Sequence, residues 1–132
     1  MREATTPKGT LTMRTVAMPA NANPSGDIFG GWVMSQMDLA AYVASSERAG
    51  NRTVTAAVNS MAFEQPVKIG DTLCVYTSFE RVGRTSMTIH VEAWVHRHQM
   101  PDRQQVTEAQ FVMVAMDETG KPAIVPQQVG EA

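Results

Sequence analysis

The sequence predicts a single α+β domain in which a curved antiparallel sheet wraps around one long central helix. Apolar residues recur at helical spacing between Ile28 and Arg48, and an alternating pattern with a period of two residues begins at Thr53. The chain has 132 residues, which suits one hydrophobic core. Because the helical segment is apolar on much of its surface, the strands that follow are expected to curl around it.

Each element is predicted from its local pattern. Residues 1–9 are expected to form a flexible tail, residues 10–126 the folded domain, and residues 127–132 a second tail. The helix is expected to begin within 28–31, to bury a stripe of small and apolar residues, and to end at Gly50 after Arg48. Strands are expected at 11–18, 53–63, 72–82, 85–98 and 106–116, and the stripe comprises Val33, Met37, Ala40, Ala41 and Ala44.

The expected strand 85–98 has the clearest alternation in the chain, and a tight turn at Gly83-Arg84 joins it to the strand before. Its polar face carries the three histidines, His90, His96 and His98, on or near one side. Histidines two residues apart could share a metal ion, but no cysteine or second group of ligands accompanies them in the sequence. We therefore expect exposed strand residues and no metal site.

Composition excludes several classes of function. The formal net charge of −2 and the scattered basic residues give no reason to expect nucleic acid as a partner. No apolar run reaches the roughly 18 to 20 residues that a membrane span needs, and residues 1–9 lack the apolar core of a signal peptide. The single cysteine, Cys74, rules out an internal disulfide and suits a reducing compartment. The expected location is the cytoplasm, without membrane association.

The segment that enters the helix is the most informative part of the chain. A turn of Asn, Pro, Ser and Gly over 23–26 leads to Asp27 and then to the pair Gly30-Gly31. Between Ile28 and Ala44 the only clearly polar side chains are those of Ser35, Gln36 and Asp38. A carboxylate in so apolar a segment is costly unless it is paired, hydrogen-bonded or used in chemistry.

The run GDIFGGWVMSQMD over 26–38 resembles the hotdog-fold acyl-CoA thioesterases of the YciA type. Three shorter segments carry the same resemblance: RTVAMP at 14–19, PVKIGD at 66–71 and VGRTS at 82–86. The similarity extends over about residues 9–126 and implies hydrolysis of acyl-CoA to free coenzyme A and a carboxylic acid, as in fatty acid metabolism. Relatives usually carry two glycines in the turn after the aspartate, where this chain has Ala40-Ala41-Tyr42. This difference is expected to affect the preferred acyl-chain length.

The resemblance makes Asp38 the catalytic carboxylate. Desolvation in an apolar setting would make it a stronger base, which could activate water or attack the thioester directly to form an anhydride. The alternative is an aspartate that only caps or hydrogen-bonds a neighbouring element. The two chemical mechanisms are not distinguished by the sequence.

Gly31 is the candidate oxyanion donor, because the first N–H groups of a helix have no internal partner and a glycine lets a thioester oxygen approach closely. Gly30 is expected to contact the substrate, although both glycines could simply permit close packing. Gly31 and Asp38 are seven residues apart, or about 10 Å along a helix, so one carbonyl cannot reach both. We therefore expect a site shared between two subunits, with a dimer as the minimal active unit. The resemblance implies a trimer of dimers.

Further residues have two interpretations each. Asp27 is expected either to support catalysis or to cap the helix, and Asn23 either to contact the substrate or only to form the turn. The family fold implies that coenzyme A, as part of the substrate and not as a cofactor, contacts the second half of the chain. The candidates are Asn59 and Ser60 along the pantetheine channel and Arg84, Thr85 and Ser86 at a phosphate group. Arg84 could equally be an exposed charge on the hairpin.

Two other functions of hotdog proteins are alternatives to acyl-CoA hydrolysis. Hotdog dehydratases and hydratases pair a histidine with a carboxylate near the helix entry, and no histidine precedes His90. A non-catalytic hotdog protein that binds acyl-CoA is the remaining alternative. Sensors of that kind carry an added DNA-binding segment, for which residues 1–10 are too short.

Overall fold

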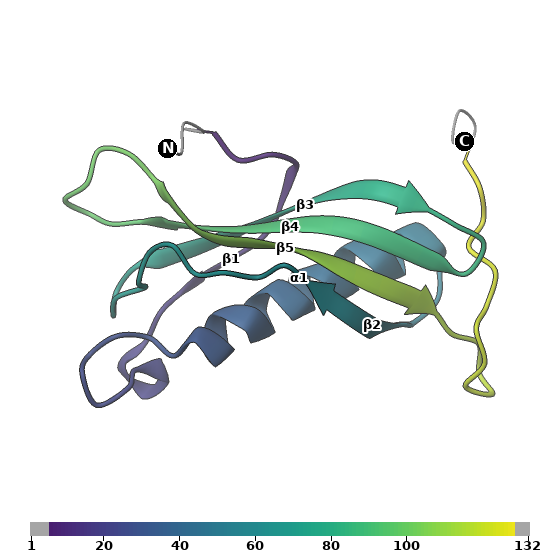
Figure 1. Ribbon diagram of the computed structural model, residues 1–132, viewed down its shortest axis with the longest axis horizontal. Helices are drawn as coiled ribbons and strands as arrows, with labels where there is room; N and C mark the ends of the chain where they lie inside the picture. Colours follow the sequence, from purple (N-terminus) through teal and green to yellow (C-terminus); the bar gives the residue numbers. More distant parts are fainter. Residues whose placement is uncertain (1–5, 129–132) are drawn as a thin grey trace.

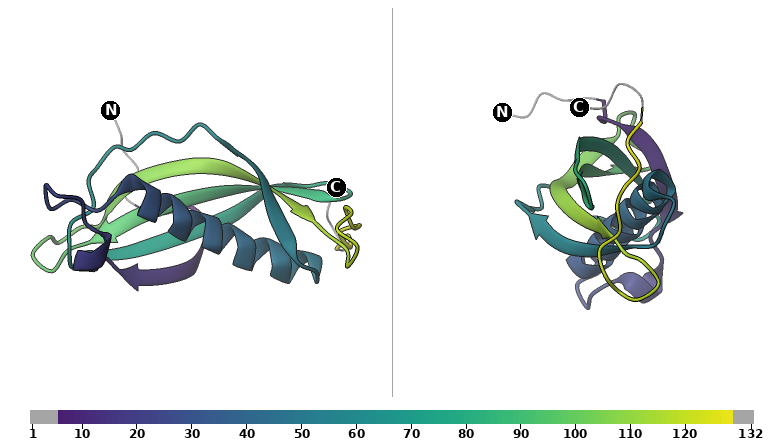
Figure 2. Two further views of the ribbon diagram at one scale, coloured as in Figure 1. Left: turned by 90° about the horizontal axis from the view of Figure 1, so that it is seen from below. Right: turned by 90° about the vertical axis from the view of Figure 1, so that its right-hand side faces the viewer.

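One helix lies along the concave face of a five-stranded sheet in the computed structural model, which describes residues 6–128 (Figure 1). The strand order is β1-β3-β4-β5-β2, and every neighbouring pair is antiparallel. Figure 2 shows the strands curling around the helix, so the predicted α+β architecture is confirmed. The elements are β1 (Thr10–Val16), a short 3₁₀ helix η1 (Pro19–Asn21), α1 (Gly30–Ala49), β2 (Thr53–Asn59), β3 (Thr72–Val82), β4 (Ser86–His96) and β5 (Gln104–Ala115).

Helix α1 buries one face against the sheet. Val33, Met37, Ala40 and Ala41 are at most 1% exposed, as the predicted stripe requires, and Ala44 packs partly buried against the same core. The helix ends as expected at Gly50, which adopts a left-handed φ of 72° and donates its N–H to the Ser46 carbonyl at 2.9 Å. Ala40 and Ala41 thus fill the core and do not line the surface around Asp38.

Several element boundaries differ from the sequence expectations. The strand expected at 53–63 ends at Asn59, because Ser60 has a φ of 63° and leaves the extended conformation. The strand expected at 85–98 ends at His96, and η1 was not anticipated. The proposed tails remain predictions, and residues 1–5 and 129–132 lie outside the described part of the chain.

The expectation that all three histidines are exposed is wrong for His90. Its side chain is 16% exposed, and Nε2 lies 2.7 Å from Oε2 of Glu92 and 3.4 Å from Oε1 of Glu108. Nδ1 lies 3.7 Å from Oε2 of Glu80. These carboxylates come from β3, β4 and β5 and converge only when the strands pair. His90, Glu92 and Glu108 each offer one atom that could ligate a metal ion, and these atoms lie within 4.8 Å of one another. The spacing of the three residues in the sequence does not reveal this cluster.

Glu92, the hydrogen-bond partner of His90, is buried. Glu92 is 6% exposed and accepts hydrogen bonds from Trp94 Nε1 at 2.8 Å and from the Lys8 backbone N–H at 3.2 Å. Burial alone would raise the pKa of Glu92, but the hydrogen bonds from His90, Trp94 and Lys8 and the charge of His90 together lower it below 4.5. Across residues 6–128 no helix is long and apolar enough to cross a membrane.

Candidate active site

Asp38 lies on the exposed side of α1 and is held by one residue of β2. The hydroxyl of Thr55 donates a short hydrogen bond to Oδ1 of Asp38, which leaves Oδ2 available to another group. The carboxylate is exposed in the single chain. Residues 6–128 of a single chain therefore do not supply the desolvation that the apolar sequence around Asp38 led us to expect.

Asp38 opens into a pocket of about 320 Å³ between α1 and the β5-β2 edge of the sheet. Gly31 lines the same pocket, two helical turns away on the same face of α1. The lining is mostly apolar and consists of Gly31, Met34, Ser35, Asp38, Thr55, Val58 and Phe111. The structure thus brings the two principal candidates to one cavity, although about 10 Å of helix separates them.

The first turn of α1 leaves backbone donors exposed. Phe29 is the N-cap residue and provides no side-chain cap, and its carbonyl accepts from Trp32 at 3.1 Å. No hydrogen bond formed within residues 6–128 uses the N–H groups of Gly30 or Gly31. A methyl group added at Gly30 would lie 3.5 Å from the ring of Phe63, whereas one at Gly31 would meet nothing within 4 Å. Gly31 is therefore the more open of the two.

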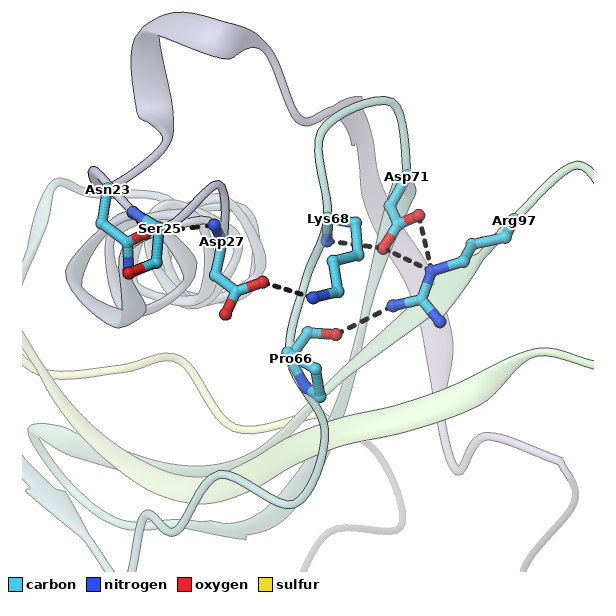
Figure 3. Close-up of polar contacts among 7 residues, drawn as sticks. All are labelled: Asn23, Ser25, Asp27, Pro66, Lys68, Asp71 and Arg97. Atoms are coloured by element: carbon cyan, nitrogen blue, oxygen red, sulfur yellow. Dashed lines mark hydrogen bonds and ion pairs between the residues drawn. The ribbon is translucent and has the colours of Figure 1, made fainter.

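The loop before α1 is fixed by polar contacts (Figure 3). Oδ1 of Asn23 accepts from the backbone N–H groups of Ser25 at 2.9 Å and Asp27 at 3.1 Å, which forms a turn around the side chain. The carboxylate of Asp27 pairs with Nζ of Lys68 at 2.5 Å. Asp27 does not cap the helix, so that alternative is wrong, because the chain places Ile28 and Phe29 between it and the first turn.

The ion pair between Asp71 and Arg97 holds the segment 66–71 in place. Asp71 is 3% exposed and accepts from Arg97 Nε at 2.9 Å and from the Lys68 backbone N–H at 2.8 Å. Arg97 Nη2 also donates to the Pro66 carbonyl at 3.0 Å, as Figure 3 shows. This segment and the helix entry enclose a second pocket of about 370 Å³, and its lining includes Asn23, Asp27 and Gly30.

The other predicted substrate contacts lie elsewhere in the single chain. Neither Asn59 nor Ser60, at the end of β2, lines the Asp38 pocket, and both are exposed. Arg84 lines a separate pocket of about 370 Å³ at the β3-β4 hairpin. Thr85 and Ser86 follow it, half-buried, and accept backbone hydrogen bonds through their carbonyls.

Thr55 is the residue that sequence reasoning missed. It lies 17 residues after Asp38, on a different element, and a threonine in an alternating strand has no distinguishing signal of its own. Identifying the contact requires knowing that β2 packs beside α1, with Thr55 level with Asp38.

Comparisons with known proteins agree on one family. The sequence profile of the Thioesterase superfamily matches residues 25–99. The acyl-CoA thioester hydrolase YciA of Salmonella typhimurium is 45% identical over 126 residues, which cover 93% of this chain and 95% of the relative. The hexameric thioesterase y2039 of Yersinia pestis has a TM-score of 0.87 at 45% identity, with 92% of this chain and 99% of that chain covered.

A more distant structural relative is the acyl-CoA hydrolase of Staphylococcus aureus, solved with butyryl coenzyme A, coenzyme A and coenzyme A disulfide. Its TM-score is 0.74 at 28% identity, with 86% of this chain and 67% of that chain covered. Variants with one aspartate or one threonine replaced by alanine have also been solved. From the fold, the sequence match and these neighbours together, the chain belongs to the hotdog-fold thioesterase superfamily, as an acyl-CoA thioester hydrolase of the YciA type.

Proposed function

We propose that Asp38 is the base or nucleophile of acyl-CoA hydrolysis and that the Gly31 N–H stabilises the oxyanion. The observation that carries this proposal is the hydrogen bond from Thr55 to Oδ1 of Asp38, which holds the carboxylate at a mostly apolar pocket. Oδ2 can take a proton from water as the water oxygen attacks the thioester carbonyl. The tetrahedral oxyanion accepts from the Gly31 N–H. As the oxyanion collapses, the C–S bond breaks and the proton on Oδ2 passes to the departing sulfur, which releases the acid and the thiol of coenzyme A and restores the Asp38 carboxylate. In the alternative mechanism, Oδ2 attacks the thioester carbonyl directly and forms an anhydride that water later hydrolyses. This mechanism also relies on Oδ2 of Asp38 and the Gly31 N–H.

The Staphylococcus aureus hydrolase supports the pairing of Asp38 with Thr55. The aspartate and threonine replaced in its variants are 17 residues apart, and the same number separates Asp38 from Thr55. We infer that the two pairs correspond, and that Thr55 orients the carboxylate while Asp38 performs the chemistry.

The working site is proposed to combine Asp38 of one subunit with Gly31 of another. The separation of about 10 Å along α1 supports this, and so does the position of β2 at the edge of the sheet. Large apolar side chains remain exposed on β2 and on the outer surface of α1: Met34, Leu39, Tyr42, Val54 and Val58. The minimal active unit is then a dimer, and the hexameric relatives favour a trimer of dimers.

The remaining contacts are assigned by the same proposal. Asp27 supports the helix entry through Lys68, and Asn23 and Gly30 line the pocket beside it. Asn59, Ser60, Arg84, Thr85 and Ser86 would contact coenzyme A from the second half of the chain. In a dimer these groups reach a substrate that crosses the boundary between subunits.

Thiol release from a panel of acyl-CoAs tests the assignment. Asp38→Ala is expected to lower kcat by about two orders of magnitude or more, as the loss of a general base does. Asp102→Ala, which removes an exposed carboxylate from the 97–103 loop, is the matched control and should leave kcat unchanged. Full activity of Asp38→Ala would refute the site. Tight coenzyme A binding without hydrolysis of any chain length would favour the acyl-CoA-binding alternative.

A further inference from the structure

A pocket of about 370 Å³ opens on the face of the sheet that points away from α1. The strand register places its members on one side: Arg14 pairs with Cys74, Cys74 pairs with Trp94, and Thr72 pairs with His96. The residues between them, such as Leu73 and Val75, point into the core under the helix. The pocket is lined by Arg14, Thr72, Cys74, Tyr76, Trp94, Val95, His96 and Arg103.

The polar groups of this pocket are hydrogen-bond donors, and two of them are the guanidinium groups of Arg14 and Arg103. Arg14 is exposed, and no hydrogen bond or ion pair within residues 6–128 engages its guanidinium. Arg103 Nη1 donates to the hydroxyl of Tyr76 at 2.7 Å, which leaves the Tyr76 O–H free to donate in turn. Tyr76 itself is only 8% exposed, so its position is fixed. His96 and the Thr72 hydroxyl complete the set.

No carboxylate of the described residues lines this pocket. Glu92 lies beside Tyr76 in the register, but its oxygens already accept from His90, Trp94 and Lys8. The other acidic side chains of this face, Glu80 and Glu108, gather around His90, farther along the strands. Although the chain has a net charge of −2, two arginines therefore meet at this pocket without a carboxylate from residues 6–128 in its lining.

We propose that this pocket binds a phosphoryl group, at a site separate from the catalytic one. The planar fork of an arginine matches phosphate oxygens, and two such forks with hydroxyl donors form a recurrent arrangement for phosphate recognition. The cavity has room for more than one phosphate. The sheet separates it from α1, so a ligand here does not contact Asp38 or Gly31 of the same chain.

Calorimetric titration of the purified oligomer with inorganic pyrophosphate tests the site. Wild type is expected to bind one pyrophosphate per chain at this pocket, and Arg14→Gln and Arg103→Gln should each weaken binding about tenfold or more. Arg52→Gln removes the same charge next to the start of β2, at the far end of the sheet, and should bind within about twofold of wild type. Absence of binding by wild type at millimolar pyrophosphate, for example because a second copy covers this face, would overturn the proposal. Equal affinities of the Arg14 and Arg52 variants would do the same.

Two further arms identify the source of the phosphoryl group. If coenzyme A displaces pyrophosphate and Arg14→Gln raises KM for acyl-CoA, the group belongs to coenzyme A held by a neighbouring chain. If coenzyme A does not displace it and KM is unchanged, the ligand is a free phosphate compound. Pyrophosphate bound instead at the β3-β4 hairpin would be lost in Arg84→Gln and kept in Arg14→Gln, which would overturn this site without touching the hydrolase assignment.

Discussion

The Thr55–Asp38 hydrogen bond fixes one oxygen of a carboxylate that is otherwise exposed. A carboxylate on an exposed helix face would rotate freely, and only part of its population would point Oδ2 at an attacking water. Thr55→Val removes the donor while keeping the shape of the side chain. We expect kcat to fall about tenfold, which corresponds to the net value of one hydrogen bond to a charged group, with KM little changed.

Thr55→Ser retains a hydroxyl at the same position and is the matched control. It should restore most of kcat, since the donor is present again. A Thr55→Val enzyme with the kcat of wild type would show that Asp38 needs no orienting partner.

At this scale the sequence predicts some residues of the candidate site and not others. Asp38 and Gly31 were predicted because they lie in one continuous segment whose pattern is informative by itself. The contact of Thr55 with Asp38 could not be predicted, because it joins a helix to a strand. The surroundings of His90 were missed for a similar reason: Glu80 and Glu108 reach it from other strands.

Glu92 makes stability depend on pH. The pKa of Glu92 in the folded chain is below 4.5, its ordinary value in the unfolded chain. At a pH between the folded pKa and 4.5, Glu92 therefore binds a proton more readily in the unfolded chain than in the folded one. The stabilisation is complete above about pH 4.5 and is lost as the pH falls through the folded pKa. Urea unfolding from pH 6 downward should show wild type losing more stability than Glu92→Gln. Glu118→Gln, at an exposed turn, should follow wild type, and parallel curves for wild type and Glu92→Gln would contradict the assignment.

Among the elements, the long ones were predictable and their ends were not. The helix and the order of strands follow from changes in hydrophobic period, which side-chain burial enforces over many residues. The end of β2 was overestimated because Met61 and Phe63 continue the alternation, while the backbone turns away at Ser60. Likewise, η1 spans three residues, too short for any periodicity to indicate it.

Two ion pairs hold the segment 66–71, and they differ in how far they are buried and therefore in how much they should stabilise the fold. The Asp71 side chain is 4% exposed and its Arg97 partner 26%, whereas Lys68 and Asp27 are 50% and 38% exposed. Arg97→Ala leaves a buried carboxylate without its partner and should lower the free energy of unfolding by about 3 kcal/mol. Lys68→Ala, at the exposed pair, should cost less than about 1 kcal/mol. Chemical denaturation of both variants measures the difference, and equal losses would show that burial does not determine the strength of these pairs.

For the whole molecule, the distance between Gly31 and Asp38 makes a prediction about mixed assemblies. Gly31→Leu has room in the single chain, because nothing lies within 4 Å of a Cβ there, but it should block the approach of a thioester oxygen. Asp38→Ala and Gly31→Leu should each be inactive alone. Co-expressed with different affinity tags and isolated as mixed oligomers, they should regain activity, since a dimer of the two has one site with both residues intact. Mixed oligomers as inactive as either parent would place both residues of a site in one chain.

A site that joins Asp38 of one chain to Gly31 of another would also determine how steeply activity falls as altered chains are mixed with wild-type chains. With Asp38→Ala alone, each site needs only one intact aspartate, so activity declines in proportion to the fraction of altered chains. A chain carrying both changes disables both sites of every dimer it enters, and activity should decline with the square of the intact fraction. The chain with both changes would then lower the activity of wild-type chains in the same oligomer. A chain with either single change would lower total activity only in proportion to its share of the mixture.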